Sequence, residues 1–275
     1  MSQRMERLVI VGCGTMGNAI VGGLLRDGWL PRDRVTLTAR TADAAQALSR
    51  EHGVAAVTDN VAACQAADVV LLCLKPQRLP ALLAESNMVA ALADKLVISI
   101  AAGVSLERLE LWMPASAVVR AMPNTPCLIG QGMTVISRGA AVSDQQIEWG
   151  KQIFASVGEC IELEGKHMDA VTSLNGSGPA FAYVMLEAMA DGGVMMGLPR
   201  DVALQIAAQV FRGAASMVLD TDLHPAALRD QVTTPAGCTI AGLLNMEDGR
   251  IRSVLARTVE KAANVAAKLG QATPS

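Results

Sequence analysis

The sequence has few aromatic and few charged residues. Its 275 residues include three Trp, one Tyr and three Phe, and charged residues make up only 18% of the chain. So few aromatic side chains argue against a stacking surface for exposed bases. A formal net charge of -3 offers no basic surface to nucleic acid or to an anionic membrane. We therefore expect neither partner.

Metal-binding and hydrolytic patterns are also lacking. The six cysteines are scattered without a CxxC pair, and the three histidines lie far from them and from one another. Neither a metal site nor a disulfide framework is expected from such spacing. The sequence contains no GxSxG elbow and no HExxH motif. The chemistry must therefore come from a bound organic cofactor.

Long hydrophobic runs are missing too. No stretch of 18 apolar residues runs without a charge, a proline or a polar cluster, so a membrane-spanning helix is not expected. The charged first residues and the short run Leu8–Val11, which ends in glycine, do not fit a secretory signal. Because 51% of the residues are apolar, the chain can bury a large core. We expect a folded cytoplasmic protein.

The chain divides into two regions with different patterns. Up to about residue 165, short β-branched runs alternate with Ala-rich helical stretches, which is typical of a parallel sheet with crossover helices. The run Val69–Leu74 is apolar at every position, as expected for a strand that helices cover on both faces. Strands are predicted at 8–11, 35–39, 69–74, 96–100, 118–122, 133–136 and 160–162, and helices at 18–26, 41–52, 79–93, 106–113 and 144–156.

After Gly165 the strand patterns stop. Helices are predicted at 168–174, 180–196, 200–219, 226–231, 240–246 and 251–269, with a tight turn at Asn175–Pro179. Between Pro179 and Gly197 only Glu187 and Asp191 are charged. A helix that is apolar all round needs cover on every side, which predicts packing between subunits.

The strongest motif is a glycine-rich loop that directly follows the first predicted strand and opens a helix. It reads Gly12-Cys13-Gly14-Thr15-Met16-Gly17. In a GxGxxG loop the first glycine permits a tight turn, the second lets the backbone approach a pyrophosphate, and the third allows close helix–strand packing. The helix start offers free N–H groups to the anion. The loop predicts a Rossmann-type, doubly wound, mostly parallel sheet that binds a dinucleotide.

The end of the second predicted strand indicates which dinucleotide is bound. An acidic residue there is typical of NAD, but the chain has Arg40 followed by Thr41. A guanidinium pairs well with a 2′-phosphate, so we predict NADPH, with NADH possible. Alternatively, Arg40 is a solvated residue before a helix that Thr41 caps. Asn60 is either a further cofactor contact or an N-cap.

Three more predicted strands end in turns at the same edge of the sheet, where ligands bind in open α/β folds. The first turn contains Lys75, which either faces the cofactor or is an exposed loop residue. Ala101 and Ala102 in the second turn are small enough to let a nicotinamide ring approach. Asn124 in the third either hydrogen-bonds the nicotinamide carboxamide or caps a turn.

One segment of the helical region has an unusual composition. Thr234, Gly237, Cys238 and Thr239 directly precede or begin a predicted helix. N–H groups of residues 237–239 at a helix start can receive a small carboxylate, and the two threonine hydroxyls can orient it. An ordinary capped loop between helices is the alternative.

Together these motifs resemble the pyrroline-5-carboxylate reductase family over nearly the whole chain. The resemblance rests on the glycine loop and on Leu74–Pro76, Ser99–Val104, Arg120–Pro126, Gly176–Ala180, Ala190–Gly193, Gly197–Arg200 and Asp230–Ile240. Two positions depart from the family pattern. Ala236 stands where many relatives have glycine, and Asn175 where serine is common.

The resemblance implies hydride transfer from NAD(P)H to the C=N bond of L-1-pyrroline-5-carboxylate, which gives L-proline in the last step of proline biosynthesis. It implies an NADP-binding Rossmann domain over residues 1–165 and an all-α dimerisation domain over 166–275. It further implies a homodimer through the helical domain, often assembled further. The loop from Thr234 to Thr239 would bind the substrate carboxylate, with the Thr239 hydroxyl as the catalytic group near the ring nitrogen.

Two other functions compete with this interpretation. A β-hydroxyacid dehydrogenase combines similar domains, but the pattern of that family includes a catalytic Lys on the first long helix after the loop. In this chain the corresponding predicted helix, within residues 179–196, contains no Lys. The other alternative is a non-catalytic NADP-binding sensor, which would leave the threonine-rich helix start without a task.

Overall fold

The computed structural model describes residues 5–271. These residues form two compact units. The first contains the described residues up to Ser177 together with those from Lys261 onward, and the second is Gly178–Glu260. The predicted domain boundary at residue 165 stays a prediction.

The first unit is built on an eight-stranded sheet with the order β3-β2-β1-β4-β5-β6-β7-β8. Only the β6–β7 pair is antiparallel among the neighbouring strands described. The order 3-2-1-4-5-6 of the first six strands is the dinucleotide-binding arrangement, so the predicted fold class is confirmed. The strands are β1 Leu8–Val11, β2 Val35–Thr38, β3 Ala55–Val57, β4 Val69–Leu72, β5 Leu96–Ser99, β6 Ala117–Met122, β7 Gly132–Arg138 and β8 Gly158–Glu162.

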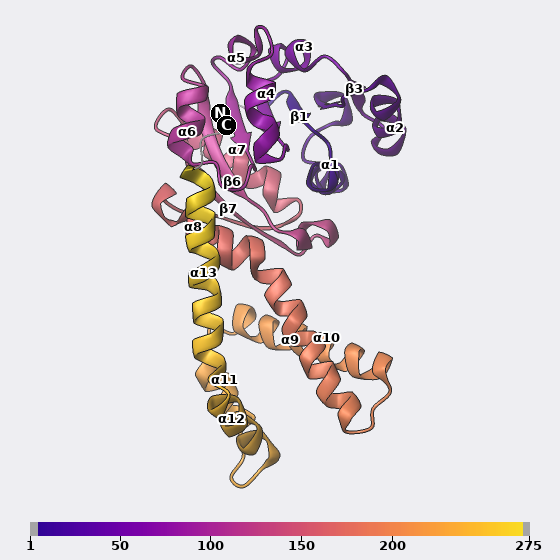
Figure 1. Ribbon diagram of the computed structural model, residues 1–275. Coiled ribbons are helices and arrows are strands. Elements are labelled where there is room, and N and C mark those ends of the chain that lie inside the picture. Colours follow the sequence, from indigo (N-terminus) through magenta and orange to yellow (C-terminus); the bar gives the residue numbers. More distant parts are fainter. Residues whose placement is uncertain (1–4, 272–275) are drawn as a thin grey trace. The chain divides into compact units, whose positions relative to one another are not determined.

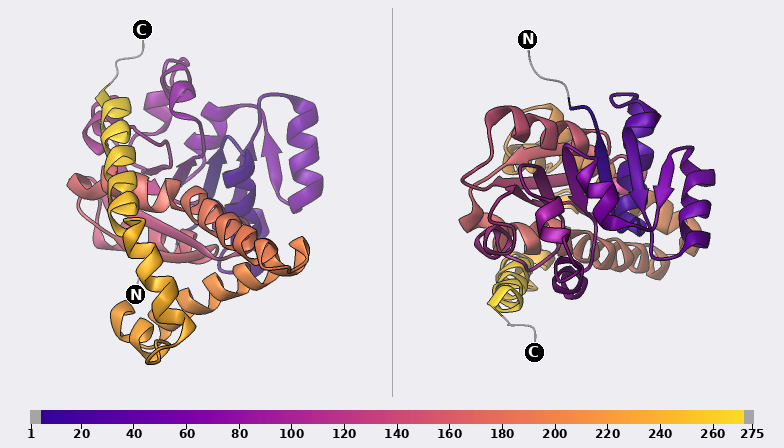
Figure 2. Two further views of the ribbon diagram at one scale, coloured as in Figure 1. Left: turned by 60° about the horizontal axis from the view of Figure 1, so that its bottom comes forward. Right: turned by 90° about the horizontal axis from the view of Figure 1, so that it is seen from above.

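Helices cover both faces of this sheet (Figures 1 and 2). On one face, α1, α2 and α7 pack against the strand side chains that point to that side and form one hydrophobic core with them. Phe154 of α7 is fully buried in this core. On the other face, α3, α4, α5 and α6 complete a second core around Leu72. The helices are α1 Thr15–Asp27, α2 Ala42–His52, α3 Asn60–Gln65, α4 Leu79–Leu83, α5 Met88–Ala91, α6 Leu106–Trp112 and α7 Asp144–Ala155.

Two predictions in this unit were incomplete. The three-residue strand β3 was missed, because Ala55–Val57 is short and contains two alanines of low β propensity. The single helix predicted over 79–93 is two short helices. Asn87, which precedes α5, has a φ of 64°, and a left-handed residue interrupts an α-helix.

The end of the first unit contains a π-helical turn. After α8, Met168–Val171, the chain forms a π-helix over Thr172–Ser177 and passes directly into α9, Gly178–Met195. The prediction of a tight turn at Asn175–Pro179 is therefore wrong. The side chain of Asn175 is hydrogen-bonded to the backbone of two residues of the sheet, which holds this turn against the strands.

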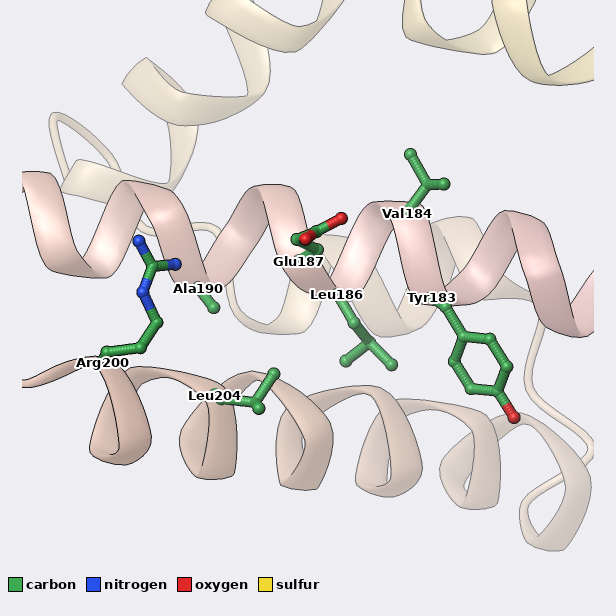
Figure 3. A pocket seen from close by; sticks show the side chains of 7 residues that line it. All are labelled: Tyr183, Val184, Leu186, Glu187, Ala190, Arg200 and Leu204. Carbon is green, nitrogen blue, oxygen red and sulfur yellow. The ribbon is translucent and has the colours of Figure 1, made fainter.

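The second unit contains α9, α10 Arg200–Asp220, α11 Pro225–Gln231, α12 Cys238–Asp248 and the beginning of α13 Ile251–Gln271. Helices α9 and α10 lie side by side (Figure 3). The small residues Ala190, Ala203 and Ala207 form a buried cluster between them. Among the described helices, α10 has the length and composition of a membrane span, with a mean hydropathy of 1.4. A helix of a soluble protein can meet the same two criteria.

Candidate active site

The sheet brings the ends of four neighbouring strands into one row. Val11 of β1 pairs with Leu72 of β4, Leu72 with Ser99 of β5, and Ser99 with Arg120 of β6. These strands are parallel, so the loops that follow them leave the sheet at the same edge. The glycine loop and the turns with Lys75, Ala101 and Asn124 therefore belong to one edge of the first unit.

The glycine loop has the conformation that its sequence requires. Gly12 adopts a φ of 83°, a left-handed region that favours glycine. A Cβ on Gly17 would lie 3.3 Å from the carbonyl oxygen of Gly12, so this residue allows α1 to pack closely. A Cβ on Gly14, by contrast, would meet nothing within 4 Å.

The start of α1 is suited to an anion. Gly14 is its N-cap, without a side-chain cap, and the first N–H groups of a helix have no acceptor within it. Gly14 and Thr15 are exposed, and Met16 is half-buried. The open space beside Gly14 together with these N–H groups fits the pyrophosphate of a dinucleotide.

The thiol in the glycine loop carries no charge that would oppose an anion. Burial, with a smaller contribution from Glu51, raises the pKa of Cys13 to about 12. The neutral thiol donates a hydrogen bond to Asn18 Oδ1 at 3.0 Å. The His52 ring nitrogen Nε2 lies 3.1 Å from the same oxygen. Asn18 thus connects the loop to the end of α2.

The residues predicted to read the adenosine half lie beyond β2 and β3. Arg40 is exposed after β2, and Thr41 caps α2 by accepting a hydrogen bond from the Ala44 N–H at 3.3 Å. Asn60 is not the N-cap of α3, because Asp59 holds that position and accepts from the Ala62 N–H at 2.9 Å. The capping alternative for Asn60 is therefore excluded. Its amide donates to Glu85 Oε2 at 3.4 Å.

The turns after β4 and β5 differ in exposure. Lys75 is exposed and precedes a short 3-10 turn. Ala101 is 3% exposed, and its N–H donates to Ser99 Oγ at 3.3 Å, whereas Ala102 is exposed. Of these, only Lys75 and Ala102 present a large part of their surface to solvent.

Asn124, after β6, belongs to a network of hydrogen bonds. Its Oδ1 accepts from the Met133 N–H at 2.9 Å, and its Nδ2 donates to Asn175 Oδ1 at 2.9 Å. Asn124 is the N-cap residue of the 3-10 turn that follows, and its carbonyl accepts from the Cys127 N–H at 3.1 Å, but its side chain makes no capping bond. The sequence places Asn175 in a predicted tight turn and marks it as a departure from the family pattern, but it does not predict this bond to Asn124.

The candidate substrate-binding segment lies in the second unit, at the start of α12. Gly237 is its N-cap, again without a side-chain cap. The Gly237 N–H donates to the Thr234 carbonyl at 3.1 Å, so the prediction that this N–H is available to a ligand is wrong. The N–H groups of Cys238 and Thr239 belong to the first turn of α12, where no acceptor exists within the helix.

The loop before α12 is strained at one position. Ala236 has a φ of 57°, a conformation that a Cβ disfavours. A Cβ on Gly237 would overlap the Thr234 hydroxyl, so glycine there leaves room for that oxygen. Thr234 and Cys238 are exposed and Thr239 is half-buried. Two hydroxyls and two N–H groups thus lie within one short segment at the start of α12.

A further pocket lies between α9 and α10 and encloses about 410 Å³ (Figure 3). It is mainly apolar, and its polar end is formed by Arg200, which pairs with Asp191. Its lining residues are Tyr183, Val184, Leu186, Glu187, Ala190, Arg200 and Leu204. No group of three or more potential metal ligands occurs within residues 5–271.

The fold, the glycine loop and the row of strand ends define an oxidoreductase that uses a nicotinamide dinucleotide. Comparison with known families agrees with this class. Residues 7–103 match a family described as NADP oxidoreductase, coenzyme F420-dependent, and residues 165–269 match one described as pyrroline-5-carboxylate reductase dimerisation.

Individual relatives identify the family. A pyrroline-5-carboxylate reductase from Pisum sativum is 39% identical over 93% of this chain and 93% of its own length. A solved reductase of that name from Coxiella burnetii is 31% identical, with a TM-score of 0.86 over 97% of this chain and 99% of that chain. The pyrroline carboxylate reductase from Plasmodium falciparum, solved with NADP bound, is 27% identical. Its TM-score is 0.85 over 97% of this chain and 99% of that chain. The chain belongs to the pyrroline-5-carboxylate reductase family, which confirms the resemblance found in the sequence.

Proposed function

We propose that this chain transfers hydride from NADPH to the C=N bond of L-1-pyrroline-5-carboxylate and so produces L-proline, as the final step of proline biosynthesis. The proposal rests chiefly on one pairing: the same chain carries an open dinucleotide loop at α1 and a hydroxyl-lined helix start at α12. Membership of the family supports it.

In this proposal the first unit holds the cofactor at the edge of its sheet. The N–H groups after Gly14, including those of Thr15 and Met16, receive the pyrophosphate. In the 3-2-1-4-5-6 strand order, the β1–β3 half takes the adenosine and the β4–β6 half takes the nicotinamide. Arg40 then pairs with the 2′-phosphate, and Asn60 and Lys75 contact the ribose and phosphates. Ala101, Ala102 and Asn124 border the nicotinamide. NADH is a weaker alternative cofactor.

The second unit binds the substrate at the start of α12. The N–H groups of Cys238 and Thr239 receive the carboxylate, and the Thr234 hydroxyl orients it. Gly237 contributes space for that hydroxyl rather than an N–H group. The ring is small, so the carboxylate provides most of the binding energy and fixes the orientation of the imine.

Beyond binding the cofactor and the substrate, the reaction requires few groups from the protein. Bound NADPH supplies the hydride, and a protonated C=N carbon accepts it readily. Hydride transfer requires the donor and acceptor carbons to approach to about 3–3.5 Å. The Thr239 hydroxyl is the catalytic group: it accepts a hydrogen bond from the protonated ring nitrogen and keeps the imine charged while hydride arrives.

We also propose that the protein works as a cytoplasmic homodimer, formed through the helical region and able to assemble further. A dimerisation family matches residues 165–269. On α9 only Ala190 is buried, while Tyr183, Val184 and Met195 are 61%, 66% and 82% exposed. Exposed apolar surface of this kind is typical of an interface. Sedimentation equilibrium should give twice the chain mass or a multiple of it, and a monomer at micromolar concentration would contradict the proposal.

The activity is tested by following NADPH and NADH absorbance separately with L-1-pyrroline-5-carboxylate and with its six-membered homologue. We expect NADPH to be consumed with the five-membered imine and proline to accumulate in equal amount. If NADPH binds without being consumed, the protein is a sensor and not a reductase.

A further inference from the structure

Asn175 connects three parts of the first unit through one side chain. Its Nδ2 donates to the Met122 carbonyl at 2.7 Å, where β6 ends, and to the Met133 carbonyl at 3.0 Å in β7. Its Oδ1 accepts from Asn124 Nδ2 at 2.9 Å. A side-chain amide is the group that combines two donors and an acceptor in one plane, so a serine at this position cannot satisfy all three partners.

The direction of these bonds is fixed by the backbone. Two carbonyl oxygens face Nδ2 of Asn175, so its Oδ1 must face Asn124. The Met133 N–H donates to Asn124 Oδ1 at 2.9 Å, so the amide nitrogen of Asn124 must face Asn175. Rotating either amide by half a turn would place oxygen against oxygen and N–H against N–H. The network therefore holds Asn124 in a single orientation.

The segment that carries Asn175 is built to lie against the strands. It forms a π-helical turn, Thr172–Ser177, and such turns are rare and concentrate at functional sites. A Cβ on the neighbouring Gly176 would lie 2.5 Å from Met122 Cε, so a larger residue there would displace the end of the Met122 side chain. The hydrogen bonds of Asn175 to the Met122 and Met133 carbonyls hold this turn against the strands.

The network uses one of the two N–H groups of Asn124. We propose that Asn175 is a positioning residue that aims the remaining N–H of Asn124 at the carboxamide oxygen of the nicotinamide. This inference rests on the proposed function, in which the nicotinamide lies over the ends of β4–β6. Asn175 itself touches neither cofactor nor substrate; it acts through Asn124.

The test is a double-mutant cycle read by cofactor binding, which needs no turnover. Asn175→Ala should weaken NADPH binding about five- to tenfold, as expected for the loss of one oriented hydrogen bond. Binding of 2′-phospho-ADP-ribose, which lacks the nicotinamide, should stay unchanged. The fluorescence of bound NADPH should move toward that of free NADPH. In an Asn124→Ala background the same Asn175 substitution should have no further effect on NADPH affinity.

Asp169→Asn is the matched control. Asp169 lies 3.7 Å from the buried guanidinium of Arg120 and anchors α8, just before the π-helical turn, to β6 without contacting Asn124. Its loss should lower the melting temperature without changing the ratio of NADPH to 2′-phospho-ADP-ribose affinity. If Asn175→Ala does not fold, Asn175→Ser, which keeps one hydroxyl, provides the same cycle with smaller effects.

Three results would overturn the inference: equal weakening of both ligands, an unchanged NADPH affinity, or an Asn175 effect of the same size with and without Asn124. A failure of the proposed function looks different. The wild-type protein and the Asn175 variants would then all bind NADPH without reducing the imine.

Discussion

Replacing Gly14 with alanine tests the cofactor site at a position where the fold itself has no need of glycine. Gly14 has a φ of -87° and a ψ of -158°, which alanine adopts without strain. The added methyl would meet no protein atom within 4 Å. Alanine is a poorer N-cap than glycine but restricts the unfolded chain. The free energy of unfolding should therefore change by less than about 1 kcal/mol.

The same methyl would occupy the space that the pyrophosphate needs. Displacing one charged hydrogen-bond acceptor from the start of α1 costs about 1.5–3 kcal/mol, which corresponds to roughly 10- to 150-fold weaker NADPH binding. Titration of NADPH fluorescence measures the affinity, and thermal unfolding should shift by less than about 4 °C. Wild-type NADPH affinity in a folded Gly14→Ala protein would refute the assignment of this loop.

Gly12→Ala is the matched control for this experiment. Gly12 has a φ of 83°, and a Cβ there would overlap the side chain of Leu74. The left-handed conformation alone costs alanine about 1–2 kcal/mol. We therefore expect Gly12→Ala to lower the melting temperature, in contrast to Gly14→Ala. An equally stable Gly12→Ala protein would show that the loop tolerates another conformation.

Three further substitutions test the other assignments. Arg40→Asp should weaken NADPH binding much more than NADH binding, because it removes the charge that pairs with the 2′-phosphate and adds one that repels it; parallel losses would count against Arg40. Thr239→Ala should lower kcat with L-1-pyrroline-5-carboxylate by roughly 10- to 100-fold and leave the Kd for NADPH unchanged, whereas equal damage to both would remove Thr239 from the substrate site. Ala236→Gly relieves a φ of 57° and should raise the free energy of unfolding in urea by up to about 1 kcal/mol, the left-handed strain less the extra entropy of the unfolded glycine; a destabilised variant would contradict this account of the loop.

Features determined by local sequence were predictable. The glycine loop is specified by residues that adjoin it, and the buried strand β4 by an unbroken apolar run. The capping of α2 by Thr41 likewise depends on neighbours in the chain. The class of fold, a mostly parallel sheet with crossover helices, follows from the alternation of predicted strands and helices.

Features determined by distant contacts were not predictable. The π-helical turn depends on bonds between Asn175 and the backbone of residues 122 and 133, far away in the sequence. A glycine- and serine-rich stretch by itself favours an ordinary turn. Similarly, the hydrogen bond from the Gly237 N–H to the Thr234 carbonyl depends on how the loop closes, and residue types do not specify that closure.

The fate of the hydride tests the central claim most directly. NADPH labelled with deuterium at C4, prepared separately in its two stereochemical forms, would be mixed with the protein and L-1-pyrroline-5-carboxylate, and the product examined by mass spectrometry and NMR. We predict that one of the two forms gives proline with a single deuterium at C5, because hydride passes directly to the imine carbon. Proline that carries no deuterium from either form, or no proline at all, would contradict the account.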